Sequence, residues 1–580
     1  SLLGVLDRTL TSMGGRRLRH WLLHPLVAVD GIRERLDAVE ELVTGVETRM
    51  ALRDLLRGVA DLERLTGRIT SKAGNARDVR ALGASLERVP ELRALLGDAA
   101  PELLRRLRGE MDPLGDVTAQ INRALVDDPP LSLTEGGVIR DGFHPELDRL
   151  RGLVRGGRDW IATLQREERE RTGIAKLKVG YNKIFGYYLE VSRGQAGQVP
   201  PEYQRKQTLV NAERYVTPAL KEREEEMLTA QERMQTLENE LFCELRAAVS
   251  AEARRIQQTA EALAVLDCLL SLAEVAATRA YCRPEVGDFG ELVIRDGRHP
   301  VVEDLMKSGE FVPNDTILDP QNAAMLIVTG PNMAGKSTYL RQVALITLMA
   351  QTGSFVPAAS ARVGVVDRIF TRVGASDNLV RGESTFMVEM IETAAILNSA
   401  TDKSLLVLDE IGRGTSTFDG ISIAWSVAEH LHDQLRAKTL FATHYHELTE
   451  LGTKLEHAKN VNVAVREWNG RVVFLYRIAD GGADHSYGIQ VAQLAGLPAP
   501  VIDRARAILE SLEAGNPAPA GLPEQLWLFG PPQDTGPSPV EVELSKIDPD
   551  TLSPRDAQNL IYHLKHLANK PRKGGKSGKT

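Results

Sequence analysis

The stretch that decides the fold is AMLIVTGPNMAGKST, residues 324–338. Its first six residues are mostly apolar and do not alternate with polar ones, which predicts a strand buried on both faces of a parallel sheet. A glycine-rich turn follows, and it fills the pattern GxxxxGK[ST] with Gly330, Gly335, Lys336 and Ser337. In such loops backbone N–H groups surround phosphate oxygens, the lysine reaches the β- and γ-phosphates, and the serine hydroxyl ligates Mg²⁺. The stretch therefore predicts a site for a nucleoside triphosphate with magnesium.

Two further apolar runs, SLLVLD at 404–409 and KTLFAT at 438–443, have the same character. The first ends in Asp409, which is expected to hold Mg²⁺, and Glu410, which is expected to orient or deprotonate the attacking water. The second leads to His444, which is placed to sense the γ-phosphate. Strand-end carboxylates also cap loops, and single histidines are often structural, so the spacing alone leaves both interpretations open.

Helical patterns dominate the rest of the chain. Residues 1 to about 130 show apolar side chains at three- and four-residue spacing. Two longer, highly charged patterns at 145–171 and 217–281 have narrow apolar stripes, which favours an antiparallel coiled-coil arm. Between them, KLKVGYNKIFGYYLEVS at 176–192 predicts a small β unit. From about 287 to 510, buried strands separated by helices predict an α/β P-loop domain.

The net charge of the 580-residue chain is −8, which excludes a uniformly basic nucleic-acid coat. Residues 171–215 nevertheless carry a local excess of five positive charges. Cations interleaved with amides and tyrosine suit contacts with phosphate and sugar that do not read the bases, although a solvated charged face has the same composition. The candidate DNA contacts are Lys176, Lys178, Asn182, Lys183, Tyr187, Arg193, Arg205, Lys206, Gln207, Asn211 and Arg214.

Several classes of protein are disfavoured by what the sequence lacks. Its three cysteines have no CxxC spacing, so neither a disulfide framework nor a zinc site is supported. No run of 18 apolar residues and no signal peptide is present, so we expect a cytoplasmic protein with no membrane partner. The chain begins at Ser1 inside a helical pattern, which favours a fragment.

The ATPase-like region closely resembles the MutS family of DNA mismatch repair proteins, which belongs to the ABC ATPase superfamily. The matching segments are GPNMAGKSTYLRQ, GSFVPA, IFTRVGASDNL, ESTFMVEM, LLVLDEIGRGTST, DGISIAW and FATHYHEL, between 330 and 488. Upstream, GRHPVVE, GYNKIFGYYLEVSRG, RKQTLVNAERY and VLDRTLTSMGGRRLRHWLLHPL extend the resemblance over almost the whole chain.

The resemblance implies roles for individual residues. Asn332, Lys336, Ser337 and Thr338 would contact the nucleotide phosphates and Mg²⁺, and the rest of the loop would cradle them through Gly330, Pro331, Met333, Ala334 and Gly335. Asp409 and Glu410 would be the Walker B pair, and His444 the switch histidine. Ser384 would be the signature serine, which reaches across a dimer to the partner's γ-phosphate. Phe311 would lie against the adenine of ATP, and Tyr476 would lie on its other side.

The resemblance also implies an order of domains. An α-helical lever or core domain (1–149 and 258–285) would carry the coiled-coil arm and a small β clamp for DNA (150–257). An ABC-type ATPase domain with a C-terminal helix-turn-helix element for dimerisation would occupy 286–510. A linker (511–547), a short helical tetramerisation module (548–568) and a basic tail (569–580) would follow.

Partners follow from the same resemblance. They are double-stranded DNA, a second copy in a homodimer or tetramer, a MutL-type repair protein, and the replicative sliding clamp in the bacterial cytosol and nucleoid. The peptide expected to dock on the sliding clamp is QLWLF, made of Gln525, Leu526, Trp527, Leu528 and Phe529.

One departure from the family pattern concerns mismatch reading. Members normally begin with a mismatch-reading domain, whose Phe-x-Glu element enters the minor groove, and a connector domain. Here Phe242-Cys243-Glu244 and Phe289-Gly290-Glu291 lie in other contexts, so both domains are expected to be missing. The predicted function is that of an ATP-dependent DNA-binding ATPase of mismatch repair. Alternatives are a paralogue that binds DNA junctions or recombination intermediates, and a non-catalytic DNA-bridging scaffold.

Overall fold

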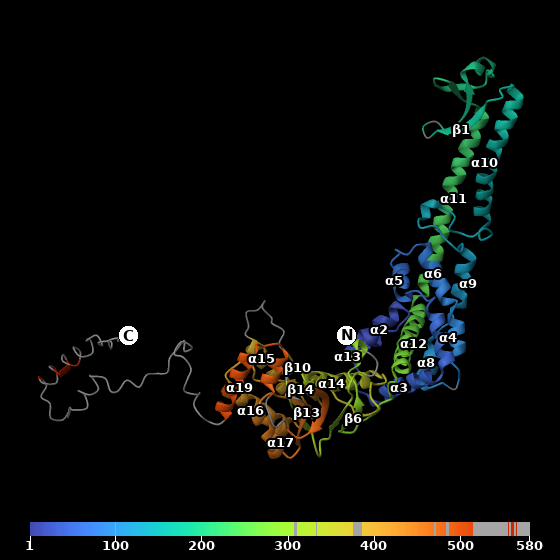
Figure 1. Cartoon of the computed structure of the whole chain (residues 1–580). Helices are drawn as coiled ribbons and strands as arrows, with labels where there is room; N and C mark the ends of the chain where they lie inside the picture. The colour runs from blue at the N-terminus through green and yellow to red at the C-terminus, as the bar shows by residue number, and fades with distance from the viewer. Residues whose placement is uncertain are drawn as a thin grey trace. The chain divides into compact units, whose positions relative to one another are not determined.

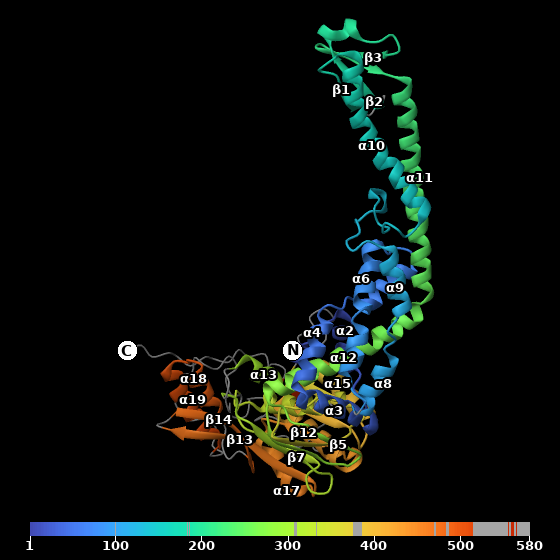
Figure 2. The ribbon, with the colours of Figure 1, turned by 90° about the vertical axis from the view of Figure 1, so that its right-hand side faces the viewer.

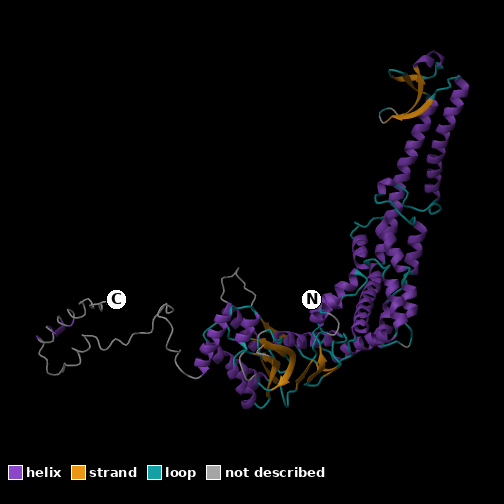
Figure 3. Cartoon of the chain, viewed as in Figure 1, coloured by secondary structure: helices purple, strands orange, loops and turns teal. Residues whose placement is uncertain are grey.

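The structure is a computed structural model of the chain. It describes residues 1–513 except 99, 183, 185, 307–309, 332, 375–384, 469–470 and 483–486, and also the helical residues 555, 558, 560, 561 and 564. These residues fall into two compact units, Ser1–Val491 and Ala492–Thr580. The larger unit is rich in helix and contains three separate sheets, so the predicted helix-rich, multidomain architecture with mixed sheets is confirmed (Figure 3).

Helix α12 (Ala253–Arg279) is the central element of the helical part (Figure 1). Its side chains are buried on almost every side, so the narrow apolar stripe predicted over 217–281 is wrong for this part of the chain. Shorter helices pack around it: α1 (Leu2–Leu6), α2 (Ser12–Leu23), α3 (Val29–Thr44), α4 (Val46–Leu56), α5 (Leu62–Thr70), α6 (Ala76–Leu86), α7 (Val89–Leu95), α8 (Glu102–Glu110) and α9 (Gly115–Ala124).

A buried carboxylate joins the start of the chain to α12. Asp267 is fully buried, and it accepts hydrogen bonds from the backbone N–H groups of Leu10 (3.0 Å) and Thr11 (2.8 Å) and from the Thr11 hydroxyl (2.7 Å). Burial raises the pKa of Asp267, and these donors act in the opposite direction. Since Thr11 also caps α2, the carboxylate fixes the entry of that helix against α12.

Two long helices leave the helical part and lie side by side, α10 (Pro145–Thr172) and α11 (Pro218–Ala251) (Figures 1 and 2). The chain between them forms an antiparallel sheet of order β1-β2-β4-β3. Its strands are β1 (Lys178–Asn182), β2 (Gly186–Ser192), β3 (Gln204–Thr208) and β4 (Ala212–Val216).

The helix predicted over 217–281 is interrupted at one residue. α11 ends and α12 begins on either side of Glu252, whose backbone (φ −91°, ψ 10°) has left the helical region. Its N–H bonds to the carbonyls of Ser250 and Val249 instead of continuing the helical ladder. The break lets one continuous segment serve as both a helix of the arm and the axis of the core.

The base of the arm is held by a buried ion pair between its two helices. Arg151 of α10 lies 2.5 Å from the carboxylate of Glu238 on α11, and both side chains are almost fully buried. Arg151 also donates to Ile139 O (2.7 Å), while Glu238 accepts from Gly137 N (2.8 Å). Ile139 and Gly137 both belong to the loop that precedes α10. The Arg151–Glu238 pair therefore ties α10 and α11 to that loop.

The α/β part is built on a six-stranded sheet of order β10-β11-β12-β8-β13-β14. All neighbours are parallel except β14, which pairs antiparallel with β13. Helix α14 (Lys336–Thr352) packs on one face, and α15 (Thr385–Ser399) and α16 (Thr417–His430) pack on the other. The strands are β8 (Met325–Thr329), β10 (Ile369–Val373), β11 (Leu405–Asp409), β12 (Lys438–Ala442), β13 (Ala458–Trp468) and β14 (Arg471–Asp480).

A smaller sheet of order β5-β9-β6-β7 lies beside it, and its strands are β5 (Glu285–Gly287), β6 (Leu292–Gly297), β7 (Asn314–Leu318) and β9 (Ser360–Gly364). Near the C-terminal end of α14, the buried amide of Gln351 donates to Leu26 O and to Val366 O, both at 2.9 Å, and accepts from Val366 N. Leu26 N in turn donates to Gln351 O (3.0 Å). These bonds join the helical part directly to the helix that follows the P-loop.

The smaller unit contains helix α19 (Ala499–Glu513), preceded by a turn at Gly496 with φ 90°. Helix α18 (Gly488–Leu494) contains the boundary between the units. Among the described residues, no helix combines the length and apolar character needed to cross a membrane.

Gly152 and Gly156 make α10 weaker than its length suggests. Both are exposed, and a Cβ at either position would meet no atom within 4 Å, so packing does not require glycine. Glycine inside a helix costs about 0.5–1 kcal/mol relative to alanine. We therefore expect Gly152→Ala and Gly156→Ala each to stabilise α10 by about that amount, measured as slower amide hydrogen exchange along the helix.

The control is Gly173→Ala. Gly173 ends α10 with φ 67°, a left-handed conformation that disfavours a Cβ, so this change should destabilise the same helix. Faster exchange in the Gly152 and Gly156 variants would contradict the expectation.

Candidate active site

The predicted phosphate loop connects β8 to α14. Gly330 (φ 127°) and Gly335 (φ 100°) adopt backbone conformations that only glycine reaches readily, so the loop turns as the motif requires. Lys336 opens α14 with only 4% of its surface exposed, and its Nζ donates to Gly330 O (2.5 Å) and Pro331 O (3.2 Å). Burial lowers the pKa of Lys336, and the carboxylates of Glu410 and Asp409 oppose that shift. The two carbonyl contacts hold the buried ammonium group of Lys336 at the loop, where it can bind an anion.

The acidic pair lies at the same edge of the sheet as the loop. Asp409 is the last residue of β11 and pairs in register with Ala442 of β12, which pairs with Val328 of β8. The next residue, Glu410, has φ 61°, and its N–H donates to Ala442 O (2.9 Å). Glu410 lies 2.5 Å from Arg413, while burial raises the pKa of Glu410.

The Asp409 side chain fits a divalent cation. It is 9% exposed, and its Oδ1 has no hydrogen-bond partner among the described residues. A buried carboxylate oxygen that lacks a donor is a suitable ligand for a hard cation such as Mg²⁺. Ser337 is the second residue of α14 and follows the buried Lys336 at the phosphate loop.

His444 follows β12 at this edge, and its ring lies 4.0 Å from the ring of Tyr445. Partial burial, together with the positive charges of Arg413 and Lys336, lowers the pKa of His444 to about 4. The imidazole is therefore neutral at pH 7 and can both donate and accept a hydrogen bond.

A cavity of about 310 Å³ adjoins the loop, and Phe311 and Tyr476 both line it. Tyr476 has φ 52°, and its carbonyl accepts from the Asn314 amide (2.9 Å), whose oxygen accepts from Ile478 N (2.7 Å). Asn314 was missed at the sequence level, because a single Asn at the start of a strand carries no local pattern. The cavity also includes Met333, Ala334, Gly335 and Thr338, so its lining joins the aromatic pair to the phosphate loop.

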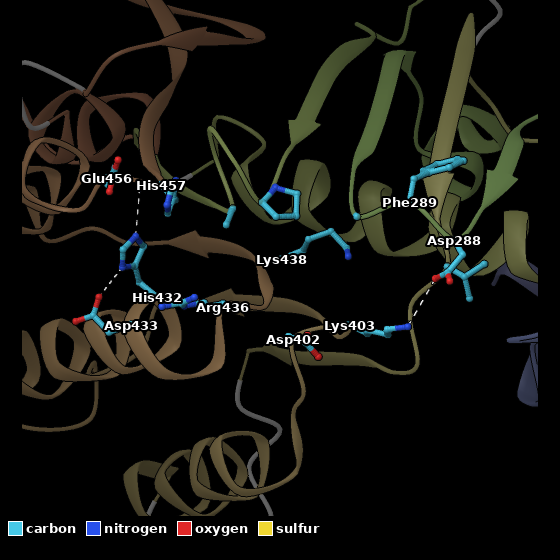
Figure 4. A pocket seen from close by; sticks show the side chains of 14 residues that line it. Asp288, Phe289, Asp402, Lys403, His432, Asp433, Arg436, Lys438, Glu456 and His457 are labelled. Carbon is cyan, nitrogen blue, oxygen red and sulfur yellow. Dashed lines mark hydrogen bonds and ion pairs between the residues drawn. The ribbon is translucent and has the colours of Figure 1, made fainter.

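A second cavity of about 770 Å³ lies at the opposite edge of the sheet (Figure 4). Its lining includes Lys403, Lys438 and His457, which lie at or just before the starts of β11, β12 and β13. Lys403 pairs with Asp288 (3.6 Å), and His432 contacts Asp433 (2.7 Å). None of the predicted site residues that the structure describes lines this cavity.

The candidate DNA contacts are brought together on the four-stranded sheet and its loops. The exposed ones are Lys176, Lys178, Arg193, Arg205, Lys206 and Asn211, and the half-buried ones are Asn182, Tyr187, Gln207 and Arg214. Arg214 is held by Glu190 (3.0 Å), and Arg205 lies 3.7 Å from Glu213. The β3–β4 pairing shifts register between Arg205 and Gln207, so Lys206 occupies a bulge on the edge strand.

Comparison with known proteins identifies the relatives of this chain. Residues 1–273 match MutS domain III, 326–513 match MutS domain V, and 531–567 match the DNA mismatch repair protein MutS C-terminal region. The DNA mismatch repair protein MutS of an Anaeromyxobacter species is 53% identical over 97% of this chain and 67% of its own length. The chain belongs to the MutS family. The proteins of the same name from Myxococcus xanthus and Acetivibrio thermocellus are 53% and 52% identical over 97% of this chain, which spans 66% of their length.

The matches do not favour either alternative. The relatives named above are all mismatch repair proteins by name, not junction-binding paralogues or scaffolds. Several predicted MutS-type residues lie outside the described residues: Asn332, Ser384, Lys183 and the peptide from Gln525 to Phe529. Their positions therefore stay predictions.

The titration of His444 tests the charge environment of this MutS-type site. We expect the imidazole to titrate at about pH 4 in the nucleotide-free chain rather than at the ordinary 6.5. Carbon-13 labelling of histidine Cε1 and NMR would follow it, and a His444→Gln spectrum would assign the signal. Because Arg413 disfavours the imidazolium, Arg413→Gln should move the midpoint upward. A wild-type midpoint at 6.5 would show that burial and the nearby positive charges do not lower the pKa of His444.

Proposed function

We propose that the chain is the ATP-hydrolysing, DNA-clamping part of a DNA mismatch repair protein. The observation that carries this proposal is the convergence of Lys336, Asp409 and Glu410 at one edge of the parallel sheet, with a buried Asp409 oxygen that has no donor among the described residues. The family membership supports the same chemistry. A non-catalytic scaffold would not need an intact triphosphate site.

ATP would bind with its phosphates in the loop at 330–338 and its base in the cavity between Phe311 and Tyr476. Asp409 and Ser337 would hold Mg²⁺, which neutralises phosphate charge when bound. Glu410 would orient the attacking water and accept its proton, and its raised pKa makes it a better base than an ordinary carboxylate. His444, neutral at pH 7, would contact the γ-phosphate by a hydrogen bond rather than by charge.

Dimerisation would complete each ATP site. Ser384 of one protomer would reach the γ-phosphate bound by the other, and the helix-turn-helix segment at 486–509 would hold the dimer together. In the smaller unit, the apolar side chains of Leu494, Leu497, Val501 and Ile508 are 36–54% exposed, which supports a partner surface there. The segment at 548–568 would join dimers into tetramers.

The arm at 150–257 would close around duplex DNA through phosphate contacts on its sheet. ATP binding would clamp two ATPase domains together, and the bonds from Gln351 to Leu26 and Val366 offer a direct path to the lever helices at 1–149 and 258–285. A MutL-type protein and the replicative sliding clamp, the latter through QLWLF at 525–529, would be its partners at the bacterial nucleoid.

Glu410→Gln tests the hydrolytic assignment. The amide keeps the shape of the side chain but cannot accept the proton of water, so ATP should still bind while turnover falls by about 100-fold or more. Radiolabelled ATP retention and phosphate release would be measured on the same preparation. Lys336→Met is the control that should lose retention as well. Undiminished phosphate release from Glu410→Gln would refute the assignment.

The DNA assignment predicts binding that depends steeply on salt and little on sequence. Arg193→Gln and Lys206→Gln should each reduce the slope of log K against log salt by about 1, because each removes one phosphate contact. Arg171→Gln is the matched control, since Arg171 is already paired with Glu168 and Glu202 at 2.7 Å. Binding that is equally strong at low and moderate salt would contradict the clamp assignment.

A further inference from the structure

A buried ion pair lies between the site of hydrolysis and the segment that carries Ser384. Arg372 is in β10, next to its end, and Glu389 is in the second turn of α15. Each residue is only 5% exposed. Neither residue lines the cavity beside the phosphate loop, and neither is needed to bind ATP or Mg²⁺ in the mechanism above.

The carboxylate of Glu389 has a separate partner for each oxygen. Its Oε1 accepts a hydrogen bond from the backbone N–H of Gly412 (2.5 Å), and its Oε2 lies 3.6 Å from Nη2 of Arg372. Arg372 in turn donates from Nη1 to Gly374 O (2.7 Å). A continuous chain of contacts therefore runs from Gly374 through Arg372 and Glu389 to Gly412.

The turn that contains Gly412 has little room to move independently. Gly412 has φ 92°, and a Cβ there would lie 2.5 Å from Gly420 O. The Tyr445 hydroxyl donates to Gly412 O (2.8 Å), and a Cβ on Gly414 would lie 2.5 Å from the Cβ of Phe386 in α15. The turn is thus seated against the start of α15, and a shift of one must displace the other.

These contacts join two functional segments of one protomer. The turn follows directly after Asp409 and Glu410, and Arg413 within it is paired with Glu410. At the other end, Gly374 and Thr385 flank residues 375–384, the segment that includes Ser384. The Arg372–Glu389 pair therefore connects two parts of one protomer. One part is its own hydrolytic residues, and the other is the two flanks of the Ser384 segment, which the protomer would offer to its partner.

We propose that Arg372 and Glu389 are positioning residues that couple the two ATP sites of the dimer. This inference rests on the composite sites of the proposed function. Nucleotide-dependent movement of Glu410 and its turn is passed through Gly412 and Glu389 to the flanks of the Ser384 segment, and so to the partner's γ-phosphate. Apolar residues of similar size would hold α15 against the sheet without the cost of burying two charges, so the pair has a purpose besides packing.

Mixed dimers separate this role from a defect confined to the variant protomer's own ATP site. Two protomers with different affinity tags are combined, and the mixed dimer is isolated by two successive affinity steps. One protomer carries Glu410→Gln, alone or with Glu389→Gln, and the other is wild type. All hydrolysis then occurs at the wild-type protomer's own site, which only the Ser384 segment of the variant protomer completes.

We expect the added Glu389→Gln to lower phosphate release from this unaltered site by about 2- to 30-fold, the range seen for coupling through packed networks. A defect confined to the variant protomer's own ATP site, which Glu410→Gln already silences, would leave the rate of the wild-type site unchanged. Glu392→Gln is the matched control, because Glu392 also contacts Arg372 (3.2 Å) but its side chain is half exposed and, among the described residues, the Gly412 N–H donates to Glu389 instead. This change should leave the rate unaltered. Arg372→Lys, which keeps the charge but loses the fork that spans Gly374 and Glu389, should reproduce the loss even where Glu389→Gln proves unstable.

A third mixed dimer, with Ser384→Ala in place of Glu389→Gln, distinguishes two failures. If Ser384→Ala slows the wild-type site while Glu389→Gln and Arg372→Lys do not, the coupling inference is overturned and the proposed function stands. If Ser384→Ala has no effect either, the composite sites are wrong and the inference falls with them.

Discussion

The parallel register of β11, β12 and β8 is the constraint on which the candidate active site depends. Asp409 pairs with Ala442 and Ala442 pairs with Val328, so the three strands end at one level. The phosphate loop, the acidic pair and His444 begin where those strands stop. Apolar side chains fill both faces of the sheet, and a slip of one residue would move each of them to the opposite face and disrupt its packing against the helices. Close packing therefore holds the register that aligns the chemistry.

The same helix that begins at the phosphate loop also reaches the helical part. α14 presents Lys336 at its first residue and Gln351 near its last, and the Gln351 amide bonds to both Leu26 and Val366. Asp267 then fixes the segment before α2 to α12. The path from the phosphate loop to the core axis therefore consists of α14, α2 and a few buried hydrogen bonds.

Patterns within short stretches of the sequence predicted the elements that depend on those stretches alone. The apolar runs at 404–409 and 438–443 became β11 (Leu405–Asp409) and β12 (Lys438–Ala442), because short uninterrupted apolar runs suit strands that are buried on both faces of a parallel sheet. The P-loop residues were found because glycine and lysine must stand at fixed spacing. Contacts between distant segments carry no such signal, so the clamping of Tyr476 by Asn314 and the Arg372–Glu389 pair became visible only in three dimensions. The break at Glu252 was also missed, since its residue type does not oppose a helix.

The two helices of the arm connect to the helical core in different ways. α11 passes into the core axis through the single residue Glu252, whereas α10 is reached through the irregular segment 125–144 and contains exposed glycines. A sideways force on the distal sheet will be borne along α11, and α10 will yield first. We therefore expect the arm to bend through deformation of α10 before α11, so that its two helices differ in flexibility before any ligand binds.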